Sequence, residues 1–162
     1  MGRKNKRVQS EYDRVTYNTR EFLRGDKVDN LLKEVSKPKY KELDYKEINI
    51  KQGEIYYVTL GERNKHSGSE QRGVKPCVIL QNDIGNRFST TTIVAVVTSE
   101  NKKDLPTHIK INYGDNGSTV LCEQLFTVSK KKIHYLPKPC YVLTEKEKEA
   151  LTKALKISLG LV

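Results

Sequence analysis

The stretch that decides the fold reads Gly68-Ser69-Glu70-Gln71-Arg72-Gly73-Val74-Lys75-Pro76, and the apolar run Cys77-Val78-Ile79-Leu80 follows it directly. Four polar or charged residues lie between its two glycines, and a lysine precedes its proline. A glycine-flanked polar loop that leads into a buried strand can hold reactive side chains on a rigid frame. Its carboxylate, amide, hydroxyl and cationic groups suit a phosphate-bearing substrate better than an apolar one.

The segments on both sides of this stretch have the composition of short strands. From Gly53 onward, β-branched and aromatic residues gather in runs that turns separate. The predicted strands cover residues 55–60, 76–80, 92–98, 107–111, 119–124 and 140–143. Several short strands at this spacing predict a mainly β (α+β) fold, with a small barrel or a strongly bent sheet.

The chain ends in a predicted amphipathic helix. Thr144 and Glu147 have the spacing of a capping box, and apolar residues then repeat at helical spacing as far as Leu159. Because only one face of this helix is apolar, we expect it to pack over one end of the sheet as part of the core.

The first fifty residues differ in composition from the rest of the chain. They carry dense alternating charge, and Asp26 is placed to cap a short amphipathic helix that Pro38 ends. We therefore predict a charged extension over residues 1–50, with one helix, and a barrel domain over residues 51–162. Two roles stay open for the extension: its helix packs on the main domain, or it contacts a partner or RNA.

Charge and cysteine content narrow the class of protein. The formal net charge is +10, which favours a polyanionic partner such as nucleic acid, although solvation alone also explains such an excess. The three cysteines do not have the spacing of metal ligands, and an odd number of cysteines argues against a disulfide framework. The basic start has no apolar run after it, and no run is long enough for a membrane helix, so a cytoplasmic location is expected.

No metal or cofactor motif is present in the sequence. His66, His108 and His134 are widely spaced, and we interpret them as surface or hydrogen-bonded histidines. If the first three strands are neighbours, Lys75, Asn82 and Thr98 approach one rim of the sheet. A cation and a hydroxyl beside a phosphate are sufficient for metal-free cleavage of RNA, in which the 2′-hydroxyl of the substrate attacks.

Five segments together resemble the MazF/PemK toxins, a family of type II toxin–antitoxin endoribonucleases. They are residues 53–55, the stretch 68–76, residues 81–88, Pro106-Thr107-His108 and residues 121–124, and they occur in the order and spacing of the family. The resemblance implies an SH3-like β-barrel with a C-terminal helix that forms a homodimer. It also implies sequence-specific cleavage of single-stranded mRNA without a cofactor, leaving 2′,3′-cyclic phosphate and 5′-hydroxyl ends, under the control of a cognate antitoxin.

The resemblance also assigns the site. Thr98 matches a catalytic threonine, and Lys75 occupies the position of a catalytic arginine. The predicted RNA-binding residues, from this match and from the strand ends, are Ser69, Glu70, Gln71, Arg72, Asn82, Ser99, Glu123 and Gln124. The lysine leaves three options open: Lys75 replaces the arginine, Arg72 takes over its role, or the enzyme is weakened to a binder.

Two other classes of function fit the same residues. One is a non-catalytic RNA- or DNA-binding module, and the other is a toxin that acts on a protein target, as one topoisomerase poison of this general fold does. Five further lysines are predicted to hold flanking phosphates, or else to form a solvated surface: Lys102, Lys103, Lys130, Lys131 and Lys132.

Overall fold

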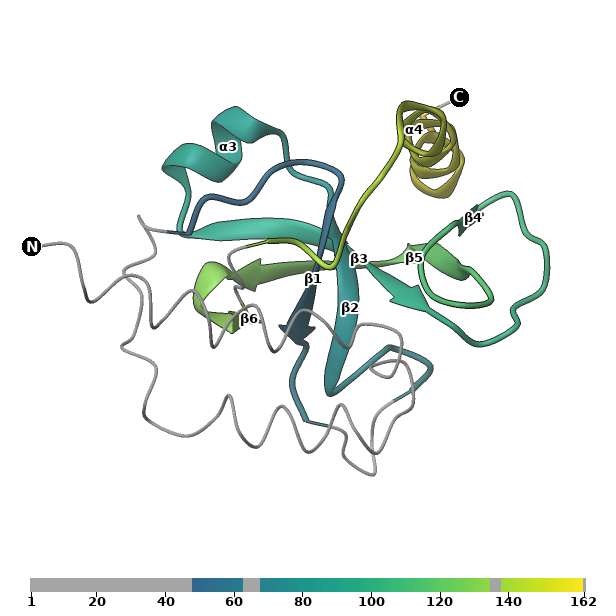
Figure 1. The fold of residues 1–162 in the computed structure, drawn as a ribbon, viewed down its shortest axis with the longest axis horizontal. Helices are drawn as coiled ribbons and strands as arrows, with labels where there is room; N and C mark the ends of the chain where they lie inside the picture. The colour runs from purple at the N-terminus through teal and green to yellow at the C-terminus, as the bar shows by residue number, and fades with distance from the viewer. Residues whose placement is uncertain (1–47, 63–67, 135–137, 162) are drawn as a thin grey trace, which may run out of the picture. The chain divides into compact units, whose positions relative to one another are not determined.

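The computed structural model describes residues 48–62, 68–134 and 138–161, and a single antiparallel sheet bent into a half-barrel dominates them (Figure 1). Its strands are β1 (Glu54–Thr59), β2 (Val74–Ile79), β3 (Thr91–Thr98), β4 (His108–Ile111), β5 (Ser118–Ser129), β6 (Ile133–His134) and β7 (Tyr141–Val142). The strand order is β4-β5-β3-β2-β1-β6, and β7 also pairs with β1. The predicted fold, mainly β with a C-terminal helix, is confirmed.

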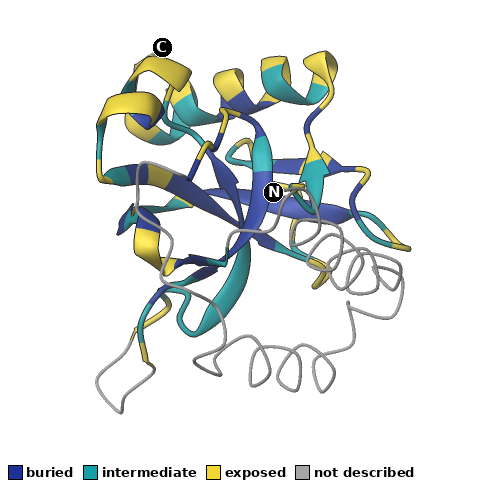
Figure 2. Cartoon of the chain, turned by 60° about the vertical axis from the view of Figure 1, so that its left-hand side comes forward, coloured by how far each residue is buried: buried dark blue, intermediate teal, exposed yellow. Residues whose placement is uncertain are grey.

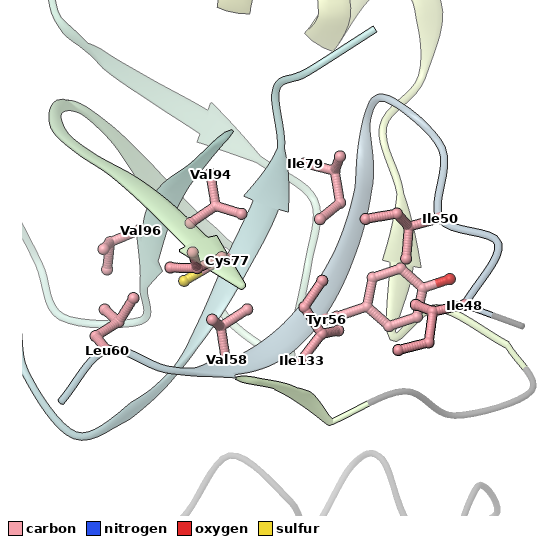
Figure 3. Close-up of a cluster of buried hydrophobic side chains, with 11 residues drawn as sticks. Ile48, Ile50, Tyr56, Val58, Leu60, Cys77, Ile79, Val94, Val96 and Ile133 are labelled. Carbon is pink, nitrogen blue, oxygen red and sulfur yellow. The ribbon is translucent and has the colours of Figure 1, made fainter. Parts of the chain in front are cut away.

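The two central strands are apolar because both of their faces are covered. Cys77 pairs with Val96, and Val78 pairs with Ala95, so alternate residues of β2 and β3 point to opposite sides of the sheet. On the concave side, the residues that Figure 3 shows close together form one core cluster. Its members are Ile48, Ile50, Tyr56, Val58, Leu60, Cys77, Ile79, Val94, Val96, Val128 and Ile133.

The C-terminal helix α4 (Glu145–Leu159) begins and packs as its sequence predicts. Thr144 accepts a hydrogen bond from the backbone of Glu147, and the Glu147 carboxylate accepts one from the backbone of Thr144, which completes the capping box. Leu151 and Ala154 are buried where the helix meets β4 and β5, and Figure 2 shows its outer face exposed. The helix therefore packs over β4 and β5, apart from the core cluster.

The sequence did not predict three elements. The segment after β2 forms a short helix, α3 (Asp83–Phe88), where we expected a polar loop. A 3-10 turn, η1 (Lys130–Lys132), and the short strand β6 follow β5, which extends five residues beyond its predicted end. Asn82 gave the signal for α3, because asparagine before an acidic first turn is a typical N-cap.

The predicted N-terminal helix lies outside the described residues. The domain boundary after residue 50 stays a prediction, although Ile48 and Ile50 already pack into the core cluster. No helix in the described ranges is long and apolar enough to cross a membrane. Cys77 and Cys122 are buried free thiols, as expected of small apolar side chains, and burial raises the pKa of Cys122 to about 12.

Candidate functional site

Lys75 and Thr98 lie at the same end of the sheet. Lys75 is the second residue of β2, and Thr98 is the last residue of β3. Cys77–Val96 is the last pair between the two strands at this end, and Lys75 and Thr98 each lie two residues beyond it, on the same face as Cys77 and Val96. Both side chains are half-buried, and we call this end of the sheet the rim.

Asn82 does not lie at the rim, so the prediction that it joins Lys75 and Thr98 there is wrong. Strand β2 runs between Lys75 and Asn82 and separates them by on the order of 15–20 Å. The Asn82 side chain instead accepts a hydrogen bond of 2.8 Å from the backbone of Gly85, as the N-cap of α3. The sequence shows that Asn82 follows the end of β2, but it does not show that this end lies opposite the one that carries Lys75.

The loop before β2 is attached to β5 by one glutamine. Gln124 accepts a hydrogen bond of 3.2 Å from the backbone of Gln71, and its Nε2 donates to the carbonyl oxygen of Ser69 at 3.4 Å. Gln124 is 53 positions from Gln71 and 55 positions from Ser69 in the sequence, and these hydrogen bonds bring the three predicted groove residues together. The amide of Gln124 holds the loop in place from across the sheet.

Within this loop, Glu70 and Arg72 bind each other. Arg72 Nη2 lies 2.7 Å from Glu70 Oε1, and this hydrogen bond is the main reason that the pKa of Glu70 is lowered. Gly73 follows with a φ of 75°, a conformation that favours glycine, and its backbone bonds to Gly61 and Leu60 close the base of the loop. The guanidinium of Arg72 is therefore already engaged by a carboxylate.

A bulge in β5 sets the direction of Glu123 and Gln124. Val96 of β3 pairs with Leu121, whereas the adjacent Ala95 pairs with Leu125, so residues 122–124 have no partner on β3. Extra residues of this kind bend a strand and redirect its side chains. Gln124 consequently reaches the loop, while Glu123 turns to His108 on β4.

His108 is held on both sides. Its Nδ1 lies 2.7 Å from the carbonyl oxygen of Lys103, and its Nε2 lies 2.8 Å from Glu123 Oε1. The side chain of His108 is only 6% exposed, whereas that of Glu123 is 40% exposed. The histidine therefore orients a carboxylate that remains open to solvent. The prediction that His108 is a hydrogen-bonded histidine is therefore confirmed. Its contact with Glu123, a predicted groove residue, was not predicted, although His108 lies in one of the segments that resemble the family.

The segment after Thr98 carries a further charged pair. Thr98 Oγ1 accepts a hydrogen bond of 3.1 Å from the backbone of Glu100, and Ser99 between them is exposed. Glu100 Oε2 lies 2.6 Å from Lys102 Nζ. Hydrogen bonding and charge from Lys102, and then the charge of Lys75, lower the pKa of Glu100. The turn after Thr98 therefore carries a lysine–carboxylate pair.

The prediction for Lys130, that it holds a phosphate or lies in a solvated surface, is wrong. Its side chain is buried, and its Nζ donates to the carbonyl oxygen of Asn86 in the last turn of α3. Asn86 is also buried; it donates to the carbonyl oxygen of Gln81 and accepts from Thr92. Lys130 occurs in a run of three lysines, and the sequence does not show which of them turns inward.

Comparison of the sequence with known proteins identifies one family. The profile of the family described as "PemK-like, MazF-like toxin of type II toxin-antitoxin system" matches residues 51–159. The endoribonuclease EndoA of Bacillus subtilis (strain 168) is 40% identical over 118 residues, which cover 70% of this chain and 97% of that protein. The matched region is the half-barrel domain with its C-terminal helix.

Solved structures share the fold. An endoribonuclease from a mycobacterial species, solved in complex with its cognate antitoxin, matches with a TM-score of 0.57 and 21% identity over 70% of this chain and 97% of that chain. MazF of Deinococcus radiodurans matches with a TM-score of 0.54 and 17% identity over 68% of this chain and 96% of that chain. At these identities the likeness concerns the fold alone.

Proposed function

The chain belongs to the PemK-like, MazF-like toxins of type II toxin–antitoxin systems, and on this premise we propose how its rim acts on RNA. It is an endoribonuclease toxin of the MazF/PemK type. Its substrate is single-stranded mRNA, which it cuts at a short sequence without a metal. The observation that carries this proposal is that Lys75 and Thr98 lie on the same face at the same end of the sheet, each two residues beyond the pair Cys77–Val96.

The reaction is an internal displacement at phosphorus. The 2′-hydroxyl of the RNA attacks the adjacent phosphate, the 5′-oxygen leaves, and the products end in a 2′,3′-cyclic phosphate and a 5′-hydroxyl. Because the nucleophile belongs to the substrate, the protein has to orient it and to stabilise the charge that grows on the phosphate oxygens. Lys75 supplies the stabilising cation, and the Thr98 hydroxyl positions the phosphate or the attacking hydroxyl.

Lys75 is a better candidate for this cation than Arg72. The guanidinium of Arg72 is bonded to Glu70 at 2.7 Å, so binding a phosphate there would require that ion pair to open. Lys75 is half-buried beside Thr98, where a partly desolvated ammonium interacts more strongly with an anion than it does in water. Arg72 and Glu70 instead shape the loop that borders the groove.

The groove itself is formed by the loop before β2 and by the bulge of β5. Ser69, Gln71 and Gln124 are joined by hydrogen bonds, and they present backbone and amide groups suited to the edges of unpaired bases. Glu123, oriented by His108, and the exposed Ser99 border the same groove. A net charge of +10 favours the RNA backbone over neutral ligands.

The partners follow from the family. We infer that the chain forms a homodimer, that a cognate antitoxin with acidic segments covers its basic groove, and that it acts in the cytoplasm, where mRNA is available. The charge of the chain supports an acidic partner. Removal of residues 1–50, followed by separate measurement of dimerisation and cleavage, tests whether the extension contributes to either property.

The test of the ribonuclease is cleavage of a long RNA in EDTA, with mapping of both new ends. We expect cyclic phosphate ends from the wild type and strong loss of cutting in Lys75→Ala and Thr98→Ala. Intact RNA at high enzyme concentration and low salt would refute the nuclease proposal. Cutting that both substitutions leave unchanged would refute the assignment of the rim.

The lysine in place of the family arginine supports one second candidate, a catalytically weak RNA-binding module. In that case RNA stays intact while affinity falls with rising salt, with a logarithmic slope of about 0.7 per neutralised phosphate of a single strand. A protein-targeting toxin would show little RNA affinity at any salt concentration. Binding titrations at three salt concentrations therefore separate the two alternatives.

A further inference from the structure

The segment that follows Thr98 returns a second lysine to the rim. The backbone of Glu100 donates to Thr98 Oγ1 at 3.1 Å, which fixes the turn directly after β3. From this turn the Glu100 carboxylate binds Lys102 Nζ at 2.6 Å. The side chain of Lys102 is only 32% exposed, against 67% for Glu100, so the lysine is the more enclosed partner. Glu100 therefore links the Lys102 ammonium to Thr98, through its carboxylate on one side and its backbone on the other.

Lys75 belongs to the same electrostatic group. Its charge acts on the Glu100 carboxylate together with that of Lys102. Lys75 is the second residue of β2, and Lys102 pairs with Glu100 directly after β3, so both lysines belong to the end of the sheet that carries Thr98. A carboxylate oxygen and a phosphate oxygen attract cationic donors in the same way, so this rim is suited to bind an anion with more than one cation.

The chemistry of the missing arginine gives this second cation a purpose. A guanidinium contacts two phosphate oxygens at once through its planar fork, whereas one ammonium acts as a point charge. A site with only Lys75 would leave one of those two oxygens without a cationic donor. A second lysine held nearby can bind that oxygen.

We propose that Lys102, positioned by Glu100, binds the scissile phosphate together with Lys75, so that two lysines replace the fork of one arginine. The inference rests on the proposed ribonuclease function and names a further binding residue for it. Lys102 contacts the phosphate, and Glu100 is a positioning residue that acts through Lys102. The arrangement does not require Arg72, which pairs with Glu70 in the loop before β2.

The test measures kcat/KM in EDTA on a synthetic RNA that contains a mapped cut site. Loss of one charge-assisted contact predicts that Lys102→Ala lowers kcat/KM by about tenfold to a hundredfold. Lys153→Ala removes the same charge from the exposed side of α4, and it should stay within about twofold of the wild type. Thermal unfolding of each variant shows that the fold is retained.

The decisive variant is Lys75→Arg, alone and with Lys102→Ala. If the two lysines together replace a fork, an arginine at position 75 makes Lys102 dispensable, and the second substitution costs less than about threefold. If Lys102→Ala lowers kcat/KM equally with lysine and with arginine at position 75, the proposal that the two lysines replace one arginine is overturned. The proposal is also overturned if Lys102→Ala is as active as Lys153→Ala while Lys75→Ala is inactive. That result would leave the ribonuclease proposal standing. A wild type that cuts no RNA removes both proposals.

Glu100→Gln tests the positioning role. It keeps the shape of the side chain but removes the charge that attracts Lys102, so we expect kcat/KM to fall by about threefold to tenfold. The same substitution should have no further effect once Lys102 is alanine, because Glu100 acts through it. A penalty that persists in the Lys102→Ala background would overturn this role.

Discussion

The two ends of the β2–β3 pair each carry a lysine, and the two lysines have opposite roles. At the rim, Lys75 is half-buried and lies at the same end of the sheet as Thr98. At the α3 end, Lys130 is buried and donates to the carbonyl oxygen of Asn86, and burial lowers its pKa. The comparison shows that the elements covering a lysine decide whether its charge is available to a substrate.

The hydrogen bonds at the two ends differ in the same way. At the α3 end, Asn86 is 2% exposed and Thr92 is fully buried, and both take part in hydrogen bonds that attach the helix to the sheet. At the rim, the carboxylate of Glu123 is held by His108 but remains 40% exposed. Buried polar groups with complete hydrogen bonds stabilise a fold, whereas exposed ones remain open to a ligand. We therefore expect substitutions at the α3 end to change stability and those at the rim to change activity.

The largest effect is expected at the rim. Lys75→Ala should lower kcat/KM for RNA cleavage by roughly a hundredfold to a thousandfold, because it removes the cation that faces the developing negative charge. Lys75→Arg should keep activity, since a guanidinium supplies the same charge. Both variants should unfold at nearly the wild-type temperature, and a large drop in that temperature for Lys75→Ala would contradict the contrast between the two ends.

The next effect is expected at the α3 end. Asn86→Ala leaves the carbonyl oxygen of Gln81 and the hydroxyl of Thr92 without their partner, and it should lower the free energy of unfolding by about 2–4 kcal/mol. Urea titration measures this change, and cleavage per folded molecule should stay unchanged. Ile84→Ala, at an exposed position of the same helix, serves as the control and should change stability by less than about 0.5 kcal/mol.

A smaller effect on activity is expected at Thr98. Thr98→Val keeps the shape of the side chain but removes its hydroxyl. It should lower kcat/KM by about tenfold to a hundredfold, because it removes the hydrogen bond to the phosphate and the one that Thr98 accepts from the backbone of Glu100. Thr98→Ser keeps the hydroxyl and should recover most of this loss. If serine were as inactive as valine, the role of Thr98 would lie in its packing rather than in its hydroxyl.

The smallest effect concerns pH and one histidine near the rim end of β1. His134 Nε2 lies 2.8 Å from Thr59 Oγ1, and burial lowers the pKa of His134 below its usual 6.5. Below pH 6.5, His134 binds a proton in the unfolded chain but remains neutral in the folded chain. The free energy of unfolding therefore falls as the pH decreases toward the pKa of His134 in the folded state. Urea titrations at pH 7.5 and 5.5 should show a loss of no more than about 1 kcal/mol.

His134→Gln provides the control for this measurement, because it keeps a polar side chain that does not titrate. The difference in stability between pH 7.5 and 5.5 should shrink in this variant. An unchanged difference would assign the effect to other groups. Glu70, Glu100 and Glu147 are not such groups in this range, because their pKa values lie below the usual 4.5.

The strands and α4 could be predicted because their signals are local. Runs of β-branched, aromatic and other apolar residues predicted β1 and β3 to within a residue or two, and the capping box predicted where α4 begins. Helix α3 was missed because its six residues are too few for an apolar repeat to appear. The second half of β5 was missed because a bulge interrupts the strand at residues 122–124.

The site could be predicted in part for a related reason. Lys75 and Thr98 lie at the start of β2 and at the end of β3, so their meeting follows once those strands pair antiparallel. The error at Asn82 has the same origin, because it lies beyond the other end of β2. The contacts between Gln124 and the loop and between His108 and Glu123 depend on the bulge, which no spacing in the sequence reveals.

The sequence alone determined the family and the mainly β fold with its C-terminal helix, because short-range periodicity, capping and matching motifs carry that information. It also led to the proposal that the loop 68–76 borders a phosphate site. Tertiary structure alone decided which charges are available. It buried Lys130 beneath α3, bound Arg72 to Glu70, and placed Lys102 beside Glu100 at the rim. Whether a charged side chain is available to a substrate depends on its burial and on its ionic partners. Both are determined only when the sheet, the loops and the helices have packed together.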